Sequence, residues 1–215
     1  MLFRSPRLLR IAYSPKLGLD VPVDTDVAAA IDRGVEQLKA AGWQITRADP
    51  VWPAGMGEGA LMPMQAAGLA ALHGEARKQH PERFDPDIAA QIERGFTLSG
   101  AEVAAALEAS QRVKRSVADF LSEFDLLLCP TAPCVAWPVT QLGPTHIGGV
   151  AVAPRGHAVF TPLFNHALTP ALSIPCGRGR ARLPVGLQMI AARGRDWDVL
   201  DAGVVAERIL IDHNA

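Results

Sequence analysis

Short apolar segments, bounded by Pro, Gly and Thr, dominate the second half of the chain. They occupy residues 125–131, 171–176 and 184–190. Strands that are buried on both faces have this pattern, because helices covering both sides of a sheet remove the need for alternating polar residues. The pattern predicts three buried strands in the core of an α/β protein.

The N-terminal segment predicts a β-α-β unit over residues 8–49. Residues 8–14 and 43–49 have the composition of strands, and a helix is expected between them. The apolar positions of this helix form one stripe: Val27, Ile31, Val35 and Leu38. A side-chain oxygen of Asp24 or Thr25 is expected to cap its first turn. Strands joined through a helix are expected to be parallel, with a right-handed crossover.

Residues 60–124 are predicted to be mainly helical. The segment 61–80 is rich in Ala, Leu and Met. We interpret its apolar stripe as core packing, with the lining of a substrate channel as the alternative; the stripe contains Met62, Met64, Leu69 and Leu72. Ser99 and Glu102 have the spacing of a capping box, in which each side chain binds the other's backbone N–H, so a long helix is expected to begin there.

The chain is expected to end in a helix at residues 197–211. Its predicted inward-facing residues are Trp197, Leu200, Val204 and Val205, and the outward-facing ones are Arg195, Asp196, Asp198 and Glu207. No repeat, low-complexity tract or linker interrupts the chain. We therefore expect residues 1–215 to form a single unit, made of the β-α-β unit at 8–49, the helical region at 60–124, and the buried strands and final helix at 125–211.

Composition excludes several classes of partner. The chain is 49% hydrophobic and 20% charged, with a net charge of −1 and no dense run of Lys and Arg, so nucleic acid is not expected to bind. No apolar run reaches the roughly 18 residues that span a bilayer, so no membrane association is expected. Three cysteines fit a reducing cytoplasm better than a disulfide framework. The basic segment at residues 1–10 is interpreted as the start of the first strand, with a cleaved targeting segment as the alternative.

Few residues have the spacing of known catalytic or metal-binding motifs. Cys129 and Cys134 flank one turn, and no second pair of ligands completes a tetrahedral site, so we expect neither a metal nor another cofactor. A GxSxG motif and a phosphate-binding Gly loop are both absent from the sequence. A cysteine nucleophile with His157 or His166 as its base is an alternative, although buried apolar cysteines are usually inert.

Four residues are candidates for contact with a small-molecule substrate. Thr131 lies at the carboxyl end of the strand at 125–131, and ligands of α/β proteins gather beyond the carboxyl ends of strands. The alternative is that Thr131 only satisfies a local turn. Asn165 is a primary amide among apolar residues, which must find hydrogen-bond partners and serves either structure or substrate. Thr161 and His157 are weaker candidates on the same argument.

Four segments of this chain together resemble the C-terminal half of the amidase signature family, whose members hydrolyse carboxamides. They are residues 9–27, 124–133, 160–177 and 183–200, in the order and at spacings that fit the family. The resemblance implies an α/β fold with a mixed, mostly parallel sheet covered by helices on both faces. It also implies hydrolysis through an acyl-enzyme, which a serine forms while a second serine and a lysine relay protons.

The catalytic residues of that family come from a Gly/Ser-rich segment and a preceding lysine strand. This chain has no Ser-Ser and no Gly-Gly-Ser, and all seven of its serines are isolated. We therefore carry over no catalytic residue. Members of the family that use glutamine are expected to have an acid two positions before the Phe160-Thr161 pair, where this chain has Ala158. The resemblance thus favours an apolar or aryl amide over glutamine.

Three functional hypotheses follow. The favoured one is the C-terminal portion of an amidase, inactive alone and binding an amide only when the missing half completes it. The second is one component of a split amidase or amidotransferase that needs a partner chain. The third is a non-catalytic module that binds small molecules. A sheet without its other half presents open edges, so we also expect a homodimer or an aggregation-prone protein.

Overall fold

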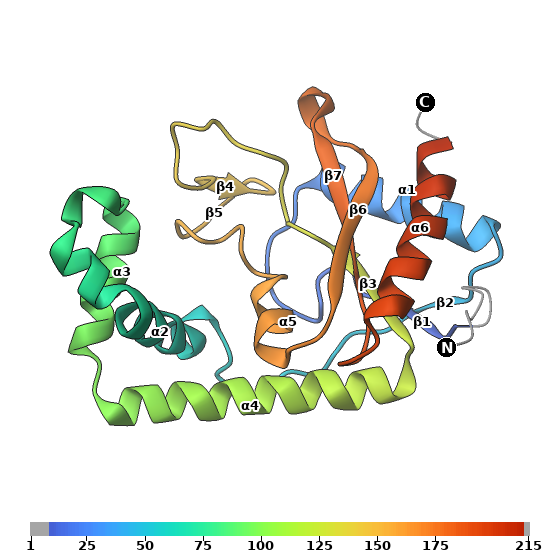
Figure 1. Ribbon diagram of the computed structural model, residues 1–215. Coiled ribbons are helices and arrows are strands. Elements are labelled where there is room, and N and C mark those ends of the chain that lie inside the picture. Colours follow the sequence, from blue (N-terminus) through green and yellow to red (C-terminus); the bar gives the residue numbers. More distant parts are fainter. Residues whose placement is uncertain (1–8, 213–215) are drawn as a thin grey trace. The chain divides into compact units, whose positions relative to one another are not determined.

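The structure is a computed structural model that describes residues 9–212 (Figure 1). This part of the chain divides into two compact units. The first contains the described residues up to Val51 and from Lys114 onward, and the second contains Trp52–Val113. The expectation of one folding unit stays a prediction, since this division does not tell whether either unit folds alone. The basic segment at residues 1–8, with its alternative targeting role, lies outside the described residues.

A five-stranded mixed sheet with the order β2-β1-β3-β7-β6 forms the centre of the first unit. Its strands are β1 (Ile11–Tyr13), β2 (Ile45–Arg47), β3 (Leu126–Pro130), β6 (Ala171–Arg178) and β7 (Pro184–Ile190). β1 is parallel to β2 and β3, whereas β7 is antiparallel to β3 and β6. The mixed α/β fold is confirmed. Its antiparallel share is larger than expected, because the short connection between β6 and β7 permits only antiparallel pairing.

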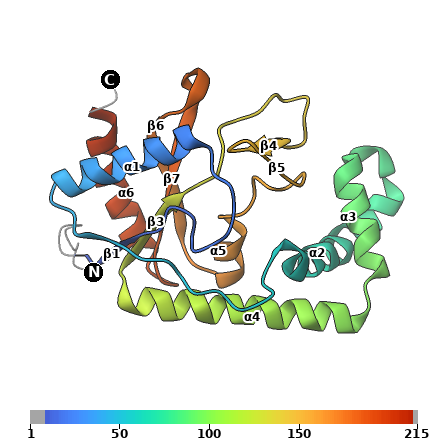
Figure 2. The ribbon, with the colours of Figure 1, turned by 180° about the vertical axis from the view of Figure 1, so that it is seen from behind.

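The β-α-β unit predicted at residues 8–49 is present. α1 (Thr25–Ala40) connects the parallel strands β1 and β2. Figure 2 shows α1 lying across the sheet. The predicted apolar stripe of the helix is buried in the core cluster that includes the sheet. Asp24 occupies the N-cap position, but the prediction that its side chain caps the helix is wrong. The carboxylate instead accepts hydrogen bonds from Gly148 and Arg180, which lie far along the sequence.

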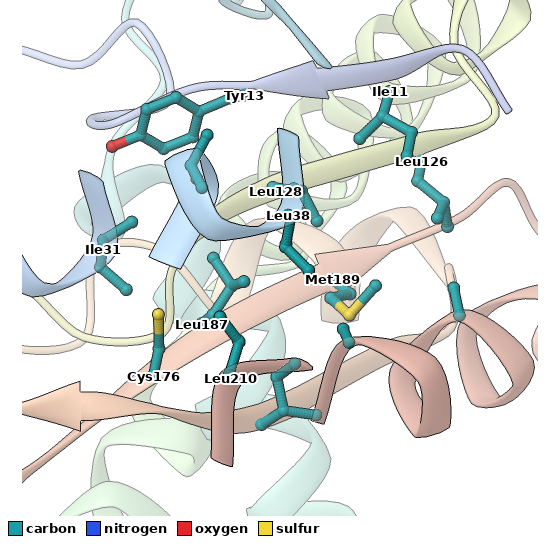
Figure 3. Packing of buried hydrophobic residues seen from close by; sticks show 14 of the residues in the cluster. Ile11, Tyr13, Ile31, Leu38, Leu126, Leu128, Cys176, Leu187, Met189 and Leu210 are labelled. Carbon is teal, nitrogen blue, oxygen red and sulfur yellow. The ribbon is translucent and has the colours of Figure 1, made fainter. Parts of the chain in front are cut away.

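Helices α1 and α6 (Asp196–Asp212) cover one face of the sheet. Side chains from both helices join those of β1, β3, β6 and β7 in one apolar cluster, which includes Ile31, Leu38, Leu128, Cys176, Leu187, Met189 and Leu210 (Figure 3). Because neighbouring residues of a strand point to opposite faces, Leu127, Cys129 and Ile190 lie on the other face. They are fully buried too, so both faces of the sheet are covered, as predicted.

The inward face of α6 differs from the predicted one. Trp197, Leu200 and Val204 are 66%, 46% and 51% exposed. The buried positions of the helix are Val199, Ala202, Gly203, Ala206 and Leu210. A Cβ atom at Gly203 would lie 2.2 Å from Cδ2 of Leu172 in β6, so the helix lies too close to the sheet for large side chains there. The prediction chose the large apolar residues of the helix. The close approach of α6 to β6 instead requires small residues, such as Gly203, at the contact.

A cluster of charged groups joins the start of α6 to the beginning of β3. Asp125 is buried, and its carboxylate accepts hydrogen bonds from the backbone N–H of Arg10 at 2.9 Å and from Nη1 of Arg195 at 3.0 Å. Arg195 also pairs with Asp198. Arg195 and Asp198, predicted to face outward, are partly buried, because Arg195 binds Asp125 and Asp198 binds Arg195.

A matched pair of substitutions tests the observed face of α6. Trp197→Ala is expected to change the free energy of unfolding by less than about 0.5 kcal/mol, because the ring is mostly exposed. Val199→Ala, two residues away, is expected to cost about 2 kcal/mol, because Val199 is 2% exposed and its truncation leaves a cavity. Urea unfolding followed by circular dichroism measures both. If Trp197→Ala lost more free energy of unfolding than Val199→Ala, the predicted inward face would be right and the observed one wrong.

The second unit contains two packed helices. They are α2 (Glu58–Gln79) and α3 (Pro86–Thr97), joined by η2 (Pro81–Arg83). A Cβ atom at Gly95 would lie 2.2 Å from the carbonyl oxygen of Ala66, so the two backbones approach closely. In the apolar stripe of α2, Met62, Met64 and Leu69 are partly buried. Leu72 is 79% exposed, so for this residue core packing is wrong.

The capping box predicted at Ser99 is confirmed. The backbone N–H of Glu102 donates to Oγ of Ser99 at 3.2 Å, and the backbone N–H of Ser99 donates to Oε2 of Glu102 at 2.8 Å. The backbone N–H and the hydroxyl of Ser99, which both donate to the carboxylate, lower the pKa of Glu102. The helix that follows is α4 (Gly100–Glu123), which begins in the second unit and ends in the first.

Four short elements complete the described chain. They are the paired strands β4 (His146–Ile147) and β5 (Val150–Ala151), the helix α5 (Pro162–Ala167) and the turn η3 (Arg180–Arg182). All four belong to the first unit. None of the helices in residues 9–212 combines the length and apolar character needed to cross a membrane.

Candidate functional site

A cleft of about 460 Å³ lies beyond the carboxyl end of β3, within the first unit. One wall is the loop that follows β3, with Thr131, Cys134 and Trp137. The other wall is formed by β6 and β7, which contribute Ser173 and Gly186. The cleft therefore occupies the place at which α/β proteins hold ligands.

A pair of hydroxyl groups joins the two walls of the cleft. Oγ1 of Thr131 and Oγ of Ser173 are 2.6 Å apart, a hydrogen-bonding distance. The backbone N–H of Thr131 donates to the carbonyl of Gly186 at 2.9 Å. In such a pair one hydroxyl donates to the other, and the second keeps a hydrogen that a substrate carbonyl can accept. Thr131 thus lines the cleft, and its predicted contact with a substrate stays a prediction.

Gly186 makes room for the two hydroxyls. A Cβ atom at this position would lie 2.7 Å from Oγ of Ser173 and 2.8 Å from Oγ1 of Thr131. Real side chains do not approach so closely, so any larger residue would displace the pair. The need for glycine at position 186 depends on the register of β6 and β7. In this register Gly186 is the partner of Pro175, and Ser173 lies two residues before Pro175.

His157 is not part of the cleft lining, and its predicted contact with a substrate stays a prediction. Its ring packs on that of Trp137, with the ring centres 4.5 Å apart. Nε1 of Trp137 donates to the carbonyl of Gln141 at 3.0 Å, which fixes the indole. Nδ1 of His157 is buried and has no hydrogen-bond partner among the described residues. His157 therefore supports the wall by holding Trp137.

Asn165 and Thr161 do not line the cleft. Thr161 precedes α5, and its carbonyl accepts from the backbone N–H of Phe164 at 3.2 Å. Asn165 lies on α5 and is exposed, so the premise that its amide is surrounded by apolar residues is wrong. The proposed roles of Asn165 and Thr161 in binding substrate stay predictions.

Asp24 ties three segments together next to the cleft, a role that sequence reasoning missed. Its backbone N–H donates to the carbonyl of Pro133, in the loop that follows β3, at 2.8 Å. Its carboxylate accepts from the N–H of Gly148, between β4 and β5, at 2.7 Å, and from Nη2 of Arg180, in η3, at 2.5 Å. The side chain of Asp24 is buried, so these donors replace water. A local pattern carries no signal of such distant partners.

The three cysteines do not have the environment of nucleophiles. All are free and buried. Burial raises the pKa of Cys129 to about 12, although the amide of Gln188 opposes this, and it raises the pKa of Cys134 and Cys176 to about 11 and 12. Burial also lowers the pKa of His166, which keeps that ring neutral. The thiolate needed for the alternative cysteine mechanism is therefore scarce.

Alkylation of the native thiols tests this point. At pH 8 we expect iodoacetamide to label each cysteine at least about 100-fold more slowly than in urea, because unfolded thiols have a pKa of about 8.5. Mass spectrometry of peptides containing Cys129, Cys134 and Cys176 measures each rate. Cys134 is the sensitive position, because it is 7% exposed and lines the cleft. Rapid labelling of native Cys134 would instead favour a reactive cysteine.

Among the described residues, no three His, Cys, Asp or Glu side chains are grouped closely enough to hold a metal ion. Two hydroxyls, one indole and several apolar side chains form the cleft wall. Such a wall can hold a small, mostly apolar molecule and donate one hydrogen bond to it. Among the described residues that line the cleft, no nucleophile is hydrogen-bonded to a base.

The comparisons with known proteins agree on one family. The family model described as Amidase matches residues 3–200. The chain is 30% identical over 196 residues to an acylamidase of Rhodococcus erythropolis, a match that covers 89% of this chain and 40% of that protein. It is 29% identical over 142 residues to a component of the glutamyl-tRNA(Gln) amidotransferase of Lachnospira eligens, a match that covers 64% of this chain and 28% of that one.

Solved structures show the same fold. A bacterial aryl acylamidase of the amidase signature enzymes superimposes with a TM-score of 0.79 at 24% identity, covering 94% of this chain and 43% of the other. The structure of another amidase superimposes with a TM-score of 0.82 at 24% identity. This match covers 94% of this chain and 46% of the other. The chain thus spans less than half the length of these relatives.

Proposed function

Because the chain belongs to the amidase signature family, we propose that it forms part of a hydrolase that cleaves a carboxamide through an acyl-enzyme. In this proposal it is the C-terminal portion of that enzyme. It supplies one wall of the substrate cleft, and the serine and lysine groups of the reaction come from the remaining part of the fold. The observation that carries the proposal is the cleft at the end of β3, with its hydroxyl pair.

The composition of the cleft supports a role in binding. The hydroxyls of Thr131 and Ser173 hydrogen-bond to each other, which leaves one hydrogen for the carbonyl oxygen of an amide. Within residues 9–212, the contacts of these two hydroxyls include no lysine or histidine that would act as a base. A hydroxyl without a base is a weak nucleophile. The wall is therefore suited to orient an amide rather than to attack it.

The apolar part of the wall supports an apolar or aryl amide as substrate. Cys134, Val135 and Trp137 line the cleft, and His157 holds the indole of Trp137 in place. The acid expected of glutamine-using relatives is replaced by Ala158. The free, buried cysteines fit a reducing compartment, which supports a cytoplasmic location.

A second candidate is one component of a split amidase or amidotransferase, favoured by the similarity to the glutamyl-tRNA(Gln) amidotransferase. A third is a small-molecule-binding module without a reaction. Turnover separates these candidates. The purified chain is assayed with an acylanilide, an aliphatic amide and glutamine, alone and after co-expression with the part of the Rhodococcus acylamidase that it does not match.

We expect no turnover by the chain alone, and hydrolysis of the acylanilide by the completed protein. Release of ammonia from glutamine would favour the amidotransferase candidate, and binding of the acylanilide without cleavage would favour the binding module. Robust hydrolysis by the chain alone, abolished by changing one of its own residues, would contradict the proposal.

Thr131→Val tests the hydroxyl pair in the completed protein. Valine keeps the shape of threonine but cannot donate, so we expect kcat/KM for the acylanilide to fall about 10-fold, the effect of one lost hydrogen bond. Thr140→Val is the matched control, because Thr140 is exposed and does not line the cleft. Equal kinetics for Thr131→Val and the unchanged protein would remove Thr131 from the site.

A further inference from the structure

A β-bulge in β6 decides which face of the sheet Arg178 occupies. Pro175 is the partner of Gly186 and both line the cleft, whereas Cys176 belongs to the apolar cluster on the opposite face. Strict alternation along the strand would put Arg178 on the same face as Cys176. The register shifts between Pro175 and Arg178, and Gly177 supplies the extra residue with a φ of 84°. Beyond the bulge the alternation is reversed, so Arg178 lies on the face of the cleft.

The partner of Arg178 places it beside the cleft. Arg178 pairs with Pro184 in β7, and Pro184 lines the cleft. Partner residues of antiparallel strands have their side chains on the same face. Gly186, next to the hydroxyls of Thr131 and Ser173, is two residues from Pro184, which is about 7 Å along a strand. Arg178 thus borders the cleft within the length of a small molecule from the hydroxyl pair.

The guanidinium of Arg178 is held in place but is not neutralised. Its Nη1 donates to the carbonyl of Arg182 at 2.8 Å, which uses only part of its N–H donors. Among the residues that the structure describes, no carboxylate forms an ion pair with Arg178 or Arg182. Both side chains are exposed, and no charged side chain of the described chain lines the cleft. Arg178 is therefore a cation without a counter-charge at the edge of an uncharged cleft.

Arg180, in the same turn, has a structural role instead. Its Nη2 donates to Oδ2 of Asp24 at 2.5 Å, and its backbone N–H donates to the carboxylate of Asp26. Asp24 precedes α1 and Asp26 lies in its first turn. These bonds anchor η3 to the start of α1. The turn that holds the guanidinium of Arg178 is thereby fixed beside the cleft.

We propose that Arg178 binds a carboxylate group of the substrate, so that the preferred amide has an aromatic ring with a carboxylate on it. The proposal deepens the proposed function and rests on it. A guanidinium donates two parallel hydrogen bonds to a carboxylate, and such charged bonds are about twice as strong as neutral ones. With the scissile carbonyl at the hydroxyl pair, one aromatic ring spans the separation to Arg178. The apolar wall of the cleft then covers the ring.

A pair of acylanilides tests the recognition of charge. 4-Acetamidobenzoate has a carboxylate where 4-nitroacetanilide has an uncharged nitro group of similar shape. Both are assayed with the completed protein, which is this chain with the part of the Rhodococcus acylamidase that it does not match. The ratio of kcat/KM for the two substrates is the measure of selectivity. We expect Arg178→Gln to lower this ratio in favour of the nitro compound about 10–100-fold, the effect of losing hydrogen bonds between charged groups.

Two further variants separate a binding site from a general positive field. Arg182→Gln removes a charge from the same turn but keeps the backbone carbonyl that holds Arg178. We expect it to change the selectivity ratio less than about threefold, because exposed charges that make no contact act weakly through water. Arg178→Lys keeps the charge and loses the two parallel donors, so its ratio should lie between those of Arg178→Gln and the unchanged protein. Equal losses in Arg178→Gln and Arg182→Gln would overturn the proposal.

Binding to the purified chain alone distinguishes this proposal from the proposed function. In an NMR titration with 4-acetamidobenzoate, we expect the Nε–H signal of Arg178 to shift and Arg178→Gln to weaken binding at least about 10-fold. Melting curves show that the variants are folded, as expected for an exposed side chain. Binding through Arg178 without turnover in the completed protein would keep this proposal and reject the proposed function. Turnover with a selectivity ratio that Arg178→Gln leaves unchanged would keep the function and reject this proposal, and so would binding that Arg178→Gln does not weaken.

Discussion

Replacing Gly34 with alanine is expected to lower the free energy of unfolding by about 1–3 kcal/mol, although alanine is the better helix former. Gly34 lies on the buried face of α1. A Cβ atom there would lie 2.2 Å from Sγ of Cys176 in β6, far inside van der Waals contact. Helix and strand would have to separate, and the cluster that joins α1, α6 and the sheet would lose contacts. Urea unfolding measures the loss.

The conflict between Gly34 and Cys176 is specific, so a second substitution should relieve it. Cys176→Ala alone is expected to cost about 1–2 kcal/mol, because it removes a buried sulfur. In the double variant the new Cβ at position 34 would lie 4.0 Å from Cβ of residue 176, an ordinary contact. The double variant should therefore be more stable than the sum of the two single losses predicts, by about 1–3 kcal/mol.

Gly68→Ala is the control for helix propensity. Gly68 lies within α2, and a Cβ atom there would meet nothing within 4 Å. Alanine should stabilise this helix by up to about 1 kcal/mol. A stabilising Gly34→Ala, or a double variant whose losses simply add, would show that Gly34 is not required by close packing.

Local patterns predicted the elements of this fold well. The apolar stripe of α1, the capping box of Ser99 and Glu102, and the buried segment of β3 each appear where expected. Each of these signals is complete within one turn or one strand, so no distant residue is needed to interpret it. The four segments that resemble one family are also short and local, so the α/β fold could be predicted from them without knowledge of distant contacts.

Features that depend on distant contacts were not predicted. Trp197 was assigned to the core because it is large and apolar, whereas the closeness of α6 to β6 requires Gly203 at the contact. Asp24 was assigned as a helix cap because it is followed by a helix. Its partners Gly148 and Arg180 are 124 and 156 positions away, and only the folded chain brings them together.

The candidate site shows the same division. Thr131 was found from its place at the end of a strand. Its partner Ser173 was not predicted, because their pairing depends on the register of β6, β7 and β3. Trp137 carried no local signal at all. Asn165 is exposed although its neighbours in the sequence are apolar, because such neighbours do not imply apolar neighbours in space on a short surface helix.

Asp125→Asn is expected to lower the free energy of unfolding by about 2–4 kcal/mol at pH 7, because hydrogen bonds to charged groups are lost in a buried place. The carboxylate accepts from the N–H of Arg10 and from the guanidinium of Arg195. An asparagine of the same shape presents an amide group to these donors and carries no charge. The two arginines would lose the counter-charge that holds the start of α6 against β3.

The loss should depend on pH with a definite sign. Burial opposes ionisation of Asp125, but the N–H of Arg10 and the guanidinium of Arg195 outweigh it and hold the pKa of the carboxyl below its ordinary value. The stabilisation is therefore complete above the unfolded pKa of about 3.9 and is lost as the pH falls through the folded value. Below that value the unchanged protein and Asp125→Asn should converge in stability.

Unfolding by urea between pH 7 and pH 2 measures this convergence. Asp119→Asn is the matched control, because Asp119 is an exposed aspartate on α4 in the same unit, and its replacement should leave both the stability and its acid dependence unchanged within about 0.5 kcal/mol. If Asp125→Asn kept the same acid dependence as the unchanged protein, the carboxylate would not be the group whose protonation loosens the junction of α6 with the sheet.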